Sequence, residues 1–549
     1  MTPRPLATEE LAVQAREALA GRLDAATLRR APASVAAVTH HGAVVSVHAH
    51  GEPRRDGAAT APGTVFRIAS MSKSFLAATV LSLRDEGLLD LHVPIERYVP
   101  EAAATRYDGR PAHLTLDMLL SNRSGLAEDN PWGDEFLGAS REFIGALVRD
   151  GLTLSATPAS TYQYSNLGQS LTGRAIEAVT GRPVEDVIRE RMLHPLGLAG
   201  TRASADLYPA GTDLAHGFRT FDDGESFVPE PYVGAGALGC IGSLFSTISD
   251  IAAWMGFLGS AFEANAADTV LAASSRREMQ VAHTLIAPAV GQFGERELDG
   301  AGYGYGLVVE HDRRFGRVVQ HAGGLPGFSS HMRWHPASGI GVVVFGNSDQ
   351  FGAGRVAGAV LHDVLGSVDA PAAIVRPWPQ TVAAARRIDD LLRTGRADAW
   401  ELMGPLARNV LRDVPAEVRT RRHEAVLTEV GPPAPDALPF EGRVVSASDS
   451  SALRWTVPCR AGALVCDVRM MGLRDPLVQA IDVQPADETG RKPRGETPLV
   501  TDHHRVPGAA PDRSLREQRR SETERQARRG VLTPPLAQGA GGALGGIGA

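Results

Sequence analysis

The sequence predicts an α+β fold in which one antiparallel sheet packs against a helical region. Strand-like stretches lie near both ends of the first 370 residues, and helical stretches alternate with Gly- and Pro-rich loops between them. After that point the segment DAPAAIVRPWP (369–379) breaks all periodicity. We therefore expect a first domain over 1–370, a small mixed α/β C-terminal domain over 376–486 and a disordered tail over 487–549.

The first element is a β-hairpin. Residues 34–50 read SVAAVTHHGAVVSVHAH, with short apolar runs on either side of His41-Gly42. The histidines at 40, 41, 48 and 50 also raise the possibility of a metal site, but no acid or cysteine stands at a helpful spacing. Exposed strand histidines are the simpler interpretation.

A buried helix is expected next, over 70–89. Its apolar residues cover more than one face, and Asp85-Glu86-Gly87 ends the pattern. Apolar residues at helical or strand spacing continue through the rest of the first domain. They predict helices over 114–120, 170–180 and 248–258. They predict strands over 305–310, 318–321, 330–335 and 340–347.

The C-terminal domain is expected to begin with helices and end with strands. The helices lie over 382–394 and 399–411, and the strands over 457–459, 463–470 and 478–483. The tail that follows is charged, rich in proline and glycine and nearly devoid of large apolar residues, which is typical of disorder.

Composition excludes several classes of function. The net charge of -7 and the scattered arginines give no basic stripe for nucleic acid. No run of about 18 uncharged apolar residues is present to span a membrane, and the N-terminus has no apolar core of a signal peptide. We therefore expect a soluble, cytoplasmic protein.

The three cysteines, Cys240, Cys459 and Cys466, are too few for a disulfide framework. Cys459 and Cys466 could face each other across a hairpin, but buried thiols are the better expectation in a reducing compartment. Cys240, in GALGCIGS, is expected to be structural even if it lies near a cleft.

The stretch FRIASMSKSF (66–75) holds Lys73, one of only two lysines among 56 basic residues. The other, Lys492, lies in the tail. A buried lysine amine can lose its proton near neutral pH, whereas a guanidinium cannot. Ser70 stands three residues earlier, so on a helix the hydroxyl and the amine are neighbours. A serine needs such a base to become a nucleophile.

Two further motifs carry small polar side chains. Tyr164-Ser165-Asn166 follows a proline-containing loop and begins an amphipathic helix, where an N-terminal cap is the simpler interpretation. His321-Ala322-Gly323-Gly324 follows a strand, and its small residues would let backbone approach a substrate. A strand that ends in a glycine turn is the alternative.

The three motifs SMSK, YSN and HAG, in this order, resemble those of the serine β-lactamase and penicillin-binding-protein superfamily. The Tyr-x-Asn pattern resembles the class C branch, and the histidine resembles its esterase and D-aminopeptidase relatives. The resemblance covers about residues 30–365 and implies the β-lactamase/transpeptidase-like fold. The C-terminal domain is weakly similar to accessory domains of such hydrolases.

The resemblance implies a catalytic group of Ser70, Lys73 and Tyr164. Ser70 would attack a carbonyl and form an acyl-enzyme, with Lys73 as proton acceptor. Tyr164 would shuttle the proton to the leaving group and later activate water, its pKa lowered by Lys73 and His321.

The resemblance also implies which residues bind the substrate and which stabilise the oxyanion. Asn166 would orient Lys73 and the substrate, and the backbone N–H groups of Ser70 and Gly324 would form the oxyanion hole. His321, Ala322 and Gly323 replace the K-T-G motif of penicillin-recognising relatives. A neutral histidine and an alanine cannot hold a substrate carboxylate as lysine and threonine do.

We therefore expect a serine hydrolase acting on a carboxylic ester, a small amide or a D-amino-acid peptide, with no metal and no organic cofactor. The alternatives are β-lactamase or D-Ala-D-Ala carboxypeptidase activity. An alternative of a different class is a binding module with a vestigial site. The sequence makes no prediction of the oligomeric state.

Overall fold

The structure is a computed structural model. It describes residues 8–486 except 264, 288–290, 294–295, 371–376, 397–404, 436–437 and 448. The described residues form two compact units, one up to residue 370 and one from residue 377. The predicted tail over 487–549 lies outside the described residues, and the domain boundaries stay a prediction.

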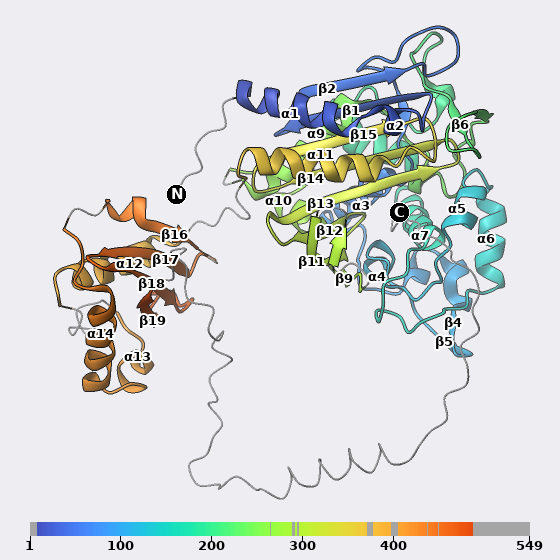
Figure 1. The fold of residues 1–549 in the computed structure, drawn as a ribbon. Helices are drawn as coiled ribbons and strands as arrows, with labels where there is room; N and C mark the ends of the chain where they lie inside the picture. Colours follow the sequence, from blue (N-terminus) through green and yellow to red (C-terminus); the bar gives the residue numbers. More distant parts are fainter. Residues whose placement is uncertain are drawn as a thin grey trace, which may run out of the picture. The chain divides into compact units, whose positions relative to one another are not determined.

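One antiparallel sheet organises the first unit (Figure 1). Its strand order is β10-β11-β12-β13-β14-β15-β1-β2, with β9 paired to β11. The predicted hairpin is confirmed, and its first strand pairs with β15, for instance Val35 with Phe345. The strands are β1 Ala33–His40, β2 Ala43–Gly51, β9 Thr284–Leu285, β10 Gly291–Phe293, β11 Arg296–Tyr303, β12 Val308–Asp312, β13 Gly316–Leu325, β14 Phe328–His335 and β15 Ile340–Gly346.

Both faces of the central strands are covered. On β1 the side chains of Val35 and Ala37 belong to one apolar cluster, and those of Ala36 and Val38 belong to another. Successive side chains of a strand point to opposite faces, so β1 contributes to two cores. This explains why its sequence is a continuous apolar run and not an alternating one.

Helices α1 (Thr8–Arg22) and α11 (Ala353–Ser367) cover one face of the sheet, and α9 (Ile248–Gly259) covers the other (Figure 1). Helix α3 (Ser72–Asp85) lies beyond α9 and is buried along almost its whole length. Its Phe75 ring stacks on Trp254 at 4.2 Å between centroids, and the Trp254 indole N–H donates to Ser74 Oγ at 3.0 Å.

The remaining elements of this unit are the other helices, single turns and two-stranded pairs. The helices are α2 Ala25–Leu28, α4 Leu116–Leu120, α5 Asn130–Glu135, α6 Arg141–Asp150, α7 Asn166–Thr180, α8 Val184–Ile188 and α10 Ala273–Met279. Single turns are η1 Ala69–Met71, η2 Ile95–Arg97, η3 Pro100–Ala104, η4 Arg189–Leu193, η5 Ala205–Leu207, η6 Gly239–Ile241 and η7 Ser260–Phe262. Two-stranded pairs join β3 Phe66–Arg67 to β8 Phe245–Ser246, β4 Arg106–Tyr107 to β5 Arg110–Pro111, and β6 Gly217–Arg219 to β7 Val228–Glu230.

The predicted helices and strands of the first unit are confirmed, with shifted ends. The helix expected from residue 70 begins as the η1 turn and becomes α-helical only at Ser72. The strand expected from Tyr305 begins at Val308, because Gly306 adopts a left-handed φ of 64° and packs against the Lys73 carbonyl. Strand β11 was not predicted, since its sequence RELDGAGY carries no alternating apolar pattern.

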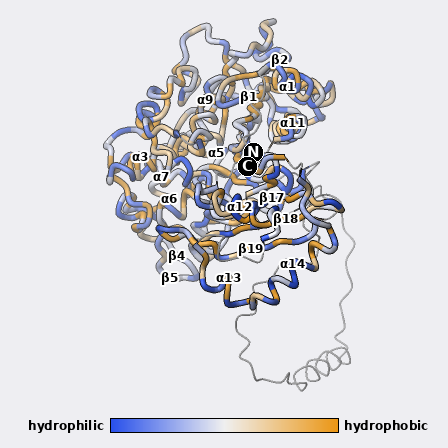
Figure 2. Tube along the Cα trace, turned by 90° about the vertical axis from the view of Figure 1, so that its left-hand side faces the viewer, coloured by the Kyte–Doolittle hydropathy of each residue, from blue (hydrophilic) through white to orange (hydrophobic). Residues whose placement is uncertain are grey.

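The C-terminal unit is a four-stranded antiparallel sheet with three helices on the described residues. From Leu453 to Cys459, buried and half-buried residues alternate along one of its strands. Both hydrophobic and hydrophilic stretches are visible in this unit (Figure 2). Its core includes a buried ion pair between Arg443 and Asp389, whose carboxylate also accepts the Trp455 indole N–H at 3.1 Å. The elements are α12 Pro379–Arg393, α13 Arg408–Arg412, α14 Ala416–Val430, η9 Phe440–Arg443, β16 Val444–Ser446, β17 Ala452–Cys459, β18 Gly462–Met470 and β19 Val478–Pro485.

The structure decides between the two possibilities for the cysteines of this unit and limits one predicted helix. Cys459 and Cys466 do not face each other, because Cys459 pairs with Gly462 and Cys466 with Trp455. All three cysteines are buried and free, as expected. The helix predicted over 399–411 falls partly outside the described residues, and within them α13 covers only 408–412.

Among the residues that the structure describes, no helix is long and apolar enough to cross a membrane.

Candidate active site

The η1 turn and helix α3 bring Ser70 and Lys73 together. The side-chain nitrogen of Lys73, Nζ, lies 3.0 Å from Ser70 Oγ. It donates a hydrogen bond to the Ile241 carbonyl at 3.3 Å. Ala69, directly before Ser70, has a φ of 48°. A non-glycine residue in this region is strained, and such strain gathers at functional sites. The predicted contact between the Ser70 hydroxyl and the Lys73 amine is therefore made.

Lys73 is fully buried, and burial lowers its pKa from 10.5 to about 7. The charges of Asp134 and Asp129 raise this pKa by less. An amine with a pKa near 7 exchanges its proton at neutral pH, which is what a general base for a serine hydroxyl requires. An arginine could not do this, because its guanidinium stays protonated.

Tyr164 lies beside this pair. Lys73 Nζ is 4.8 Å from the centroid of the Tyr164 ring. The hydroxyl is buried and has no hydrogen-bond partner among the described residues. Burial raises the pKa of Tyr164 well above 10, and the neighbouring Ser70 hydroxyl lowers it by less. The expectation of a lowered pKa is therefore wrong, because the loss of hydration outweighs the effect of the Ser70 hydroxyl.

Ser165 and Asn166 form the start of helix α7. Ser165 is the N-cap, since its Oγ accepts from the Gly168 N–H at 2.9 Å. Asn166 donates its side-chain amide to Asn130 Oδ1 at 3.0 Å. The predicted contact of Asn166 with Lys73 is not made: the Lys73 amine contacts Ser70 and Ile241, and Asn166 Oδ1 is buried with no partner among the described residues.

Asp129 holds this helix start from outside the helix. Its carboxylate accepts from Ser165 Oγ at 2.9 Å, from the Asn166 N–H at 2.6 Å and from the Leu167 N–H at 3.0 Å. These N–H groups have no partner within the helix, and the positive end of the helix dipole favours a carboxylate there. Asp129 therefore fixes the backbone directly after Tyr164.

His321 is buried on β13 and has both ring nitrogens occupied. Nδ1 lies 2.6 Å from the Ala322 carbonyl, which can only accept, so Nδ1 carries the proton. Nε2 then accepts from the Tyr303 hydroxyl at 2.9 Å. Burial, and to a smaller extent the charge of Lys73, lowers the pKa of His321 to about 3. The predicted neutral histidine is confirmed.

Gly323 lets strand β13 approach the η1 turn. A Cβ at Gly323 would lie 2.1 Å from Ser330 Oγ and 2.2 Å from the Ile68 carbonyl, whereas a Cβ at Gly324 would meet open space. Ser330 Oγ also donates to Ile68 at 2.8 Å, which ties β14 to the same turn. The pairing of β12 with β13 ends at Gln320, so Gly324 lies beyond it on an edge that β12 does not cover.

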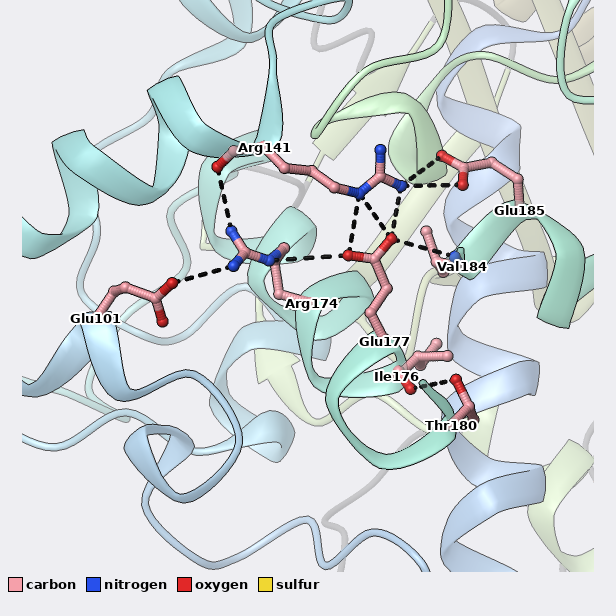
Figure 3. A network of polar contacts seen from close by, with 8 residues as sticks. All are labelled: Glu101, Arg141, Arg174, Ile176, Glu177, Thr180, Val184 and Glu185. Atoms are coloured by element: carbon pink, nitrogen blue, oxygen red, sulfur yellow. Dashed lines mark hydrogen bonds and ion pairs between the residues drawn. The ribbon is translucent and has the colours of Figure 1, made fainter. Parts of the chain in front are cut away.

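An ion-pair network joins three helices close to the site (Figure 3). Arg141 binds Glu177 and Glu185, and Arg174 binds Glu101 at 3.1 Å. A Cβ at Gly239 would lie 3.1 Å from Glu185 Oε1, so the network reaches the η6 turn that supplies the Ile241 carbonyl. Arginine and glutamate side chains therefore support the turn that receives the Lys73 hydrogen bond.

Sequence patterns missed four groups at the site: the Ile241 carbonyl, Asp129, Asp134 and Tyr303. The carbonyl is backbone and leaves no trace in residue identity. Asp129 and Asp134 belong to DNPWGDE, whose short helix has no apolar periodicity. Tyr303 was missed because its place beside His321 depends on the pairing of β11 with β12.

Comparison with known proteins gives a match to the family model described as Beta-lactamase over residues 17–365. The E. coli D-alanyl-D-alanine-carboxypeptidase/endopeptidase AmpH is 27% identical over 289 residues, 51% of this chain and 70% of AmpH. The Burkholderia gladioli esterase EstB is 32% identical over 203 residues, 33% of this chain and 50% of EstB. An unguisins hydrolase of Aspergillus campestris is 27% identical over 52% of this chain. This chain spans about half the length of the hydrolase and of the esterase.

Solved structures share the fold. The octameric penicillin-binding protein homologue of Pyrococcus abyssi has a TM-score of 0.55 at 18% identity, over 86% of this chain and 99% of its own. A β-lactamase/D-alanine carboxypeptidase of Yersinia pestis has a TM-score of 0.51 at 21% identity, over 66% of this chain and 98% of its own. The β-lactamase/transpeptidase-like fold predicted from the motifs is thereby confirmed.

Proposed function

This chain belongs to the beta-lactamase family, and from that membership we propose that it is a serine hydrolase that forms an acyl-enzyme on Ser70. The proposed substrates are carboxylic esters, small amides and D-amino-acid peptides. The observation that carries the proposal is the 3.0 Å contact between Lys73 Nζ and Ser70 Oγ, at an amine whose pKa is about 7.

In the proposed reaction, neutral Lys73 accepts the Ser70 proton while Ser70 Oγ bonds to the substrate carbonyl carbon. The backbone N–H groups of Ser70 and Gly324 bind the resulting oxyanion. The proton then passes to the leaving group as the bond to it breaks. Water hydrolyses the acyl-enzyme and returns the proton to Ser70. Because burial keeps Tyr164 neutral, we assign it the role of a phenol that relays protons, not of a phenolate base.

The substrate side favours esters and amides over β-lactams. His321 is neutral and uses both ring nitrogens within the protein, so it offers no charge to a substrate carboxylate. The relatives include an esterase and a carboxypeptidase by name. The neutral His321 therefore gives β-lactamase activity less support than ester or small-amide hydrolysis, and D-Ala-D-Ala carboxypeptidase activity, which AmpH has by name, stays the alternative.

A fluorophosphonate probe tests the nucleophile. We expect the wild-type protein to be labelled on Ser70 and Ser70→Ala to remain unlabelled, with Ser72→Ala as a folded control that keeps its label. An unlabelled wild-type protein would leave the vestigial binding module as the better interpretation. A panel of p-nitrophenyl esters, aminoacyl anilides and nitrocefin then ranks the substrates, and faster turnover of nitrocefin than of the esters would contradict the substrate preference.

A further inference from the structure

Asp134 has no part in the acyl-transfer steps proposed above, although it lies beside the site. It is on the short helix α5, directly after Gly133. A Cβ at Gly133 would lie 2.5 Å from Asn166 Cβ, so α5 packs tightly on the first residue of α7. Asn130, on the same helix, receives the Asn166 amide at 3.0 Å. Helix α5 therefore packs against the start of α7, at Asn166, two residues after Tyr164.

The charge of Asp134 reaches the reacting groups. Among the charged neighbours of Lys73, Asp134 has the largest effect and raises the pKa of the amine. The same carboxylate raises the pKa of Arg67 and that of Tyr164. In turn, Lys73 and Arg67 each lower the pKa of Asp134. The carboxylate thus lies within electrostatic reach of the nucleophile's base, the tyrosine and the arginine three residues before Ser70.

Asp134 is half-buried and makes no hydrogen bond or ion pair with the described residues. Asp129 on the same segment differs, because it accepts three hydrogen bonds. Arg67 does not compensate Asp134 directly, since it is 4% exposed and donates to the Val233 carbonyl at 2.9 Å. Burial raises the pKa of Asp134 to about 6, so it is largely ionised at neutral pH without a close partner.

The side of the site that β13 forms is neutral. On β13, His321 carries no charge and directs its ring nitrogens to Tyr303 and Ala322. A substrate carboxylate would meet the negative charge of Asp134 without a compensating cation on β13. A substrate ammonium group would supply the partner that Asp134 lacks, and a charge-assisted hydrogen bond in a partly desolvated position is strong.

We propose that Asp134 binds a protonated amine of the substrate, so that the preferred substrates are aminoacyl esters or amides with a free α-amino group. This inference rests on the proposed function, because it concerns the acyl group that Ser70 would carry. It narrows the range of esters and amides to those with a cationic group close to the scissile carbonyl.

The test compares each substrate with its N-acetylated counterpart at pH 7. Alanine p-nitroanilide, in the D and L forms, and alanine benzyl ester are the probes. For the wild-type protein we expect kcat/KM to favour the free amine roughly tenfold or more. In Asp134→Asn this ratio falls toward one, and in Asp134→Glu, which keeps the carboxylate, much of it remains. Glu135→Gln is the matched control, since Glu135 is exposed on the same helix, and its ratio should equal that of the wild type.

A wild-type ratio near one, or an unchanged ratio in Asp134→Asn, would overturn this inference. If Asp134→Asn does not fold, the ratio of kcat/KM values measured for the wild-type protein still tests the inference. Turnover of p-nitrophenyl acetate and fluorophosphonate labelling of the wild type are measured in parallel. If both are absent, the proposed function itself fails; if both are present and the ratio is one, only the role of Asp134 fails.

Discussion

At the scale of single residues, the fold holds the Lys73 amine in surroundings that disfavour its charged form. The side chain is fully buried, and its pKa is lowered from 10.5 to about 7. In the unfolded chain the amine binds its proton more tightly than in the folded chain. Protonation therefore favours unfolding at every pH below 10.5, and the penalty is complete once the pH falls below about 7.

We predict that Lys73→Met abolishes activity and stabilises the fold. At 1.36 kcal/mol per pKa unit, the penalty from Lys73 is about 5 kcal/mol at pH 7. The lost hydrogen bonds to Ser70 and Ile241 subtract about 1 to 2 kcal/mol, so we expect a net gain of about 3 kcal/mol. Urea unfolding measures it, and the gain should shrink as the pH rises toward 10.5. Lys73→Arg is the control: it keeps a charge that cannot be lost and should destabilise the protein.

The contact between Ser70 and Lys73 could be predicted because it depends on residue type and on a local spacing. The same reasoning missed Asp134 and the Ile241 carbonyl, which reach the site from distant segments. The state of Tyr164 was predicted wrongly for a related reason. Its pKa depends on how completely the fold removes water, and burial of one hydroxyl cannot be inferred from a tripeptide motif.

At the scale of elements, two junctions fix the geometry of the site. The start of α7 is held by Asp129, and strand β13 is held on η1 by the absence of a side chain at Gly323. The strands β12 to β15 and the helices α7 and α9 were predicted because their apolar residues follow a clear period. Strand β11 and helix α5 were not, because RELDGAGY and NPWGDE carry no such period and depend on their neighbours for stability.

We predict that Asp129→Ala lowers kcat more than it raises KM. The change leaves the N–H groups of Asn166 and Leu167 without their acceptor and frees the backbone after Tyr164. The free energy of unfolding should fall by about 1 to 2 kcal/mol. Steady-state kinetics and thermal unfolding measure the two effects. Glu128→Ala, a change at the exposed neighbour, should alter neither, and an equal loss in both variants would contradict the assignment.

We predict that Gly323→Ala separates β13 from η1. The added methyl group would meet Ser330 Oγ and the Ile68 carbonyl at about 2 Å, so strand or turn must move. Overpacking of this kind costs about 1 to 3 kcal/mol. The control is Gly324→Ala on the same strand, where the added methyl group would point into open space. It should change the free energy of unfolding by less than about 0.5 kcal/mol. Similar losses of stability in both variants would count against a close approach at Gly323.

At the scale of the whole first unit, buried histidines make stability depend on pH. His331 lies between β14 and α11, and neither ring nitrogen has a hydrogen-bond partner within the described part of the chain. Burial lowers its pKa well below 6.5 and lowers that of His321 to about 3. Both stay neutral in the fold while the unfolded chain takes up protons below pH 6.5. Stability is therefore complete above pH 6.5 and is lost as the pH falls below it.

We predict that His331→Leu reduces this acid sensitivity. Each histidine should contribute about 1.4 kcal/mol of lost stability per pH unit below 6.5. Urea unfolding at pH 7.5 and at pH 5.5 should therefore show a difference smaller by about 1.4 kcal/mol in the variant than in the wild type. His92→Leu, at an exposed position, is the control and should leave the difference unchanged. An unchanged difference in His331→Leu would show that the imidazole is already protonated in the fold.

The scarcity of lysine has a practical consequence for measuring these effects. Lys73 is the sole lysine among the described residues, and it is fully buried in α3. A lysine-specific protease can therefore cut within the described range only after α3 has opened. Cleavage after Lys73 then reports the opening of the first unit without any added label. Its rate can be followed under native conditions for each of the variants that keep this lysine.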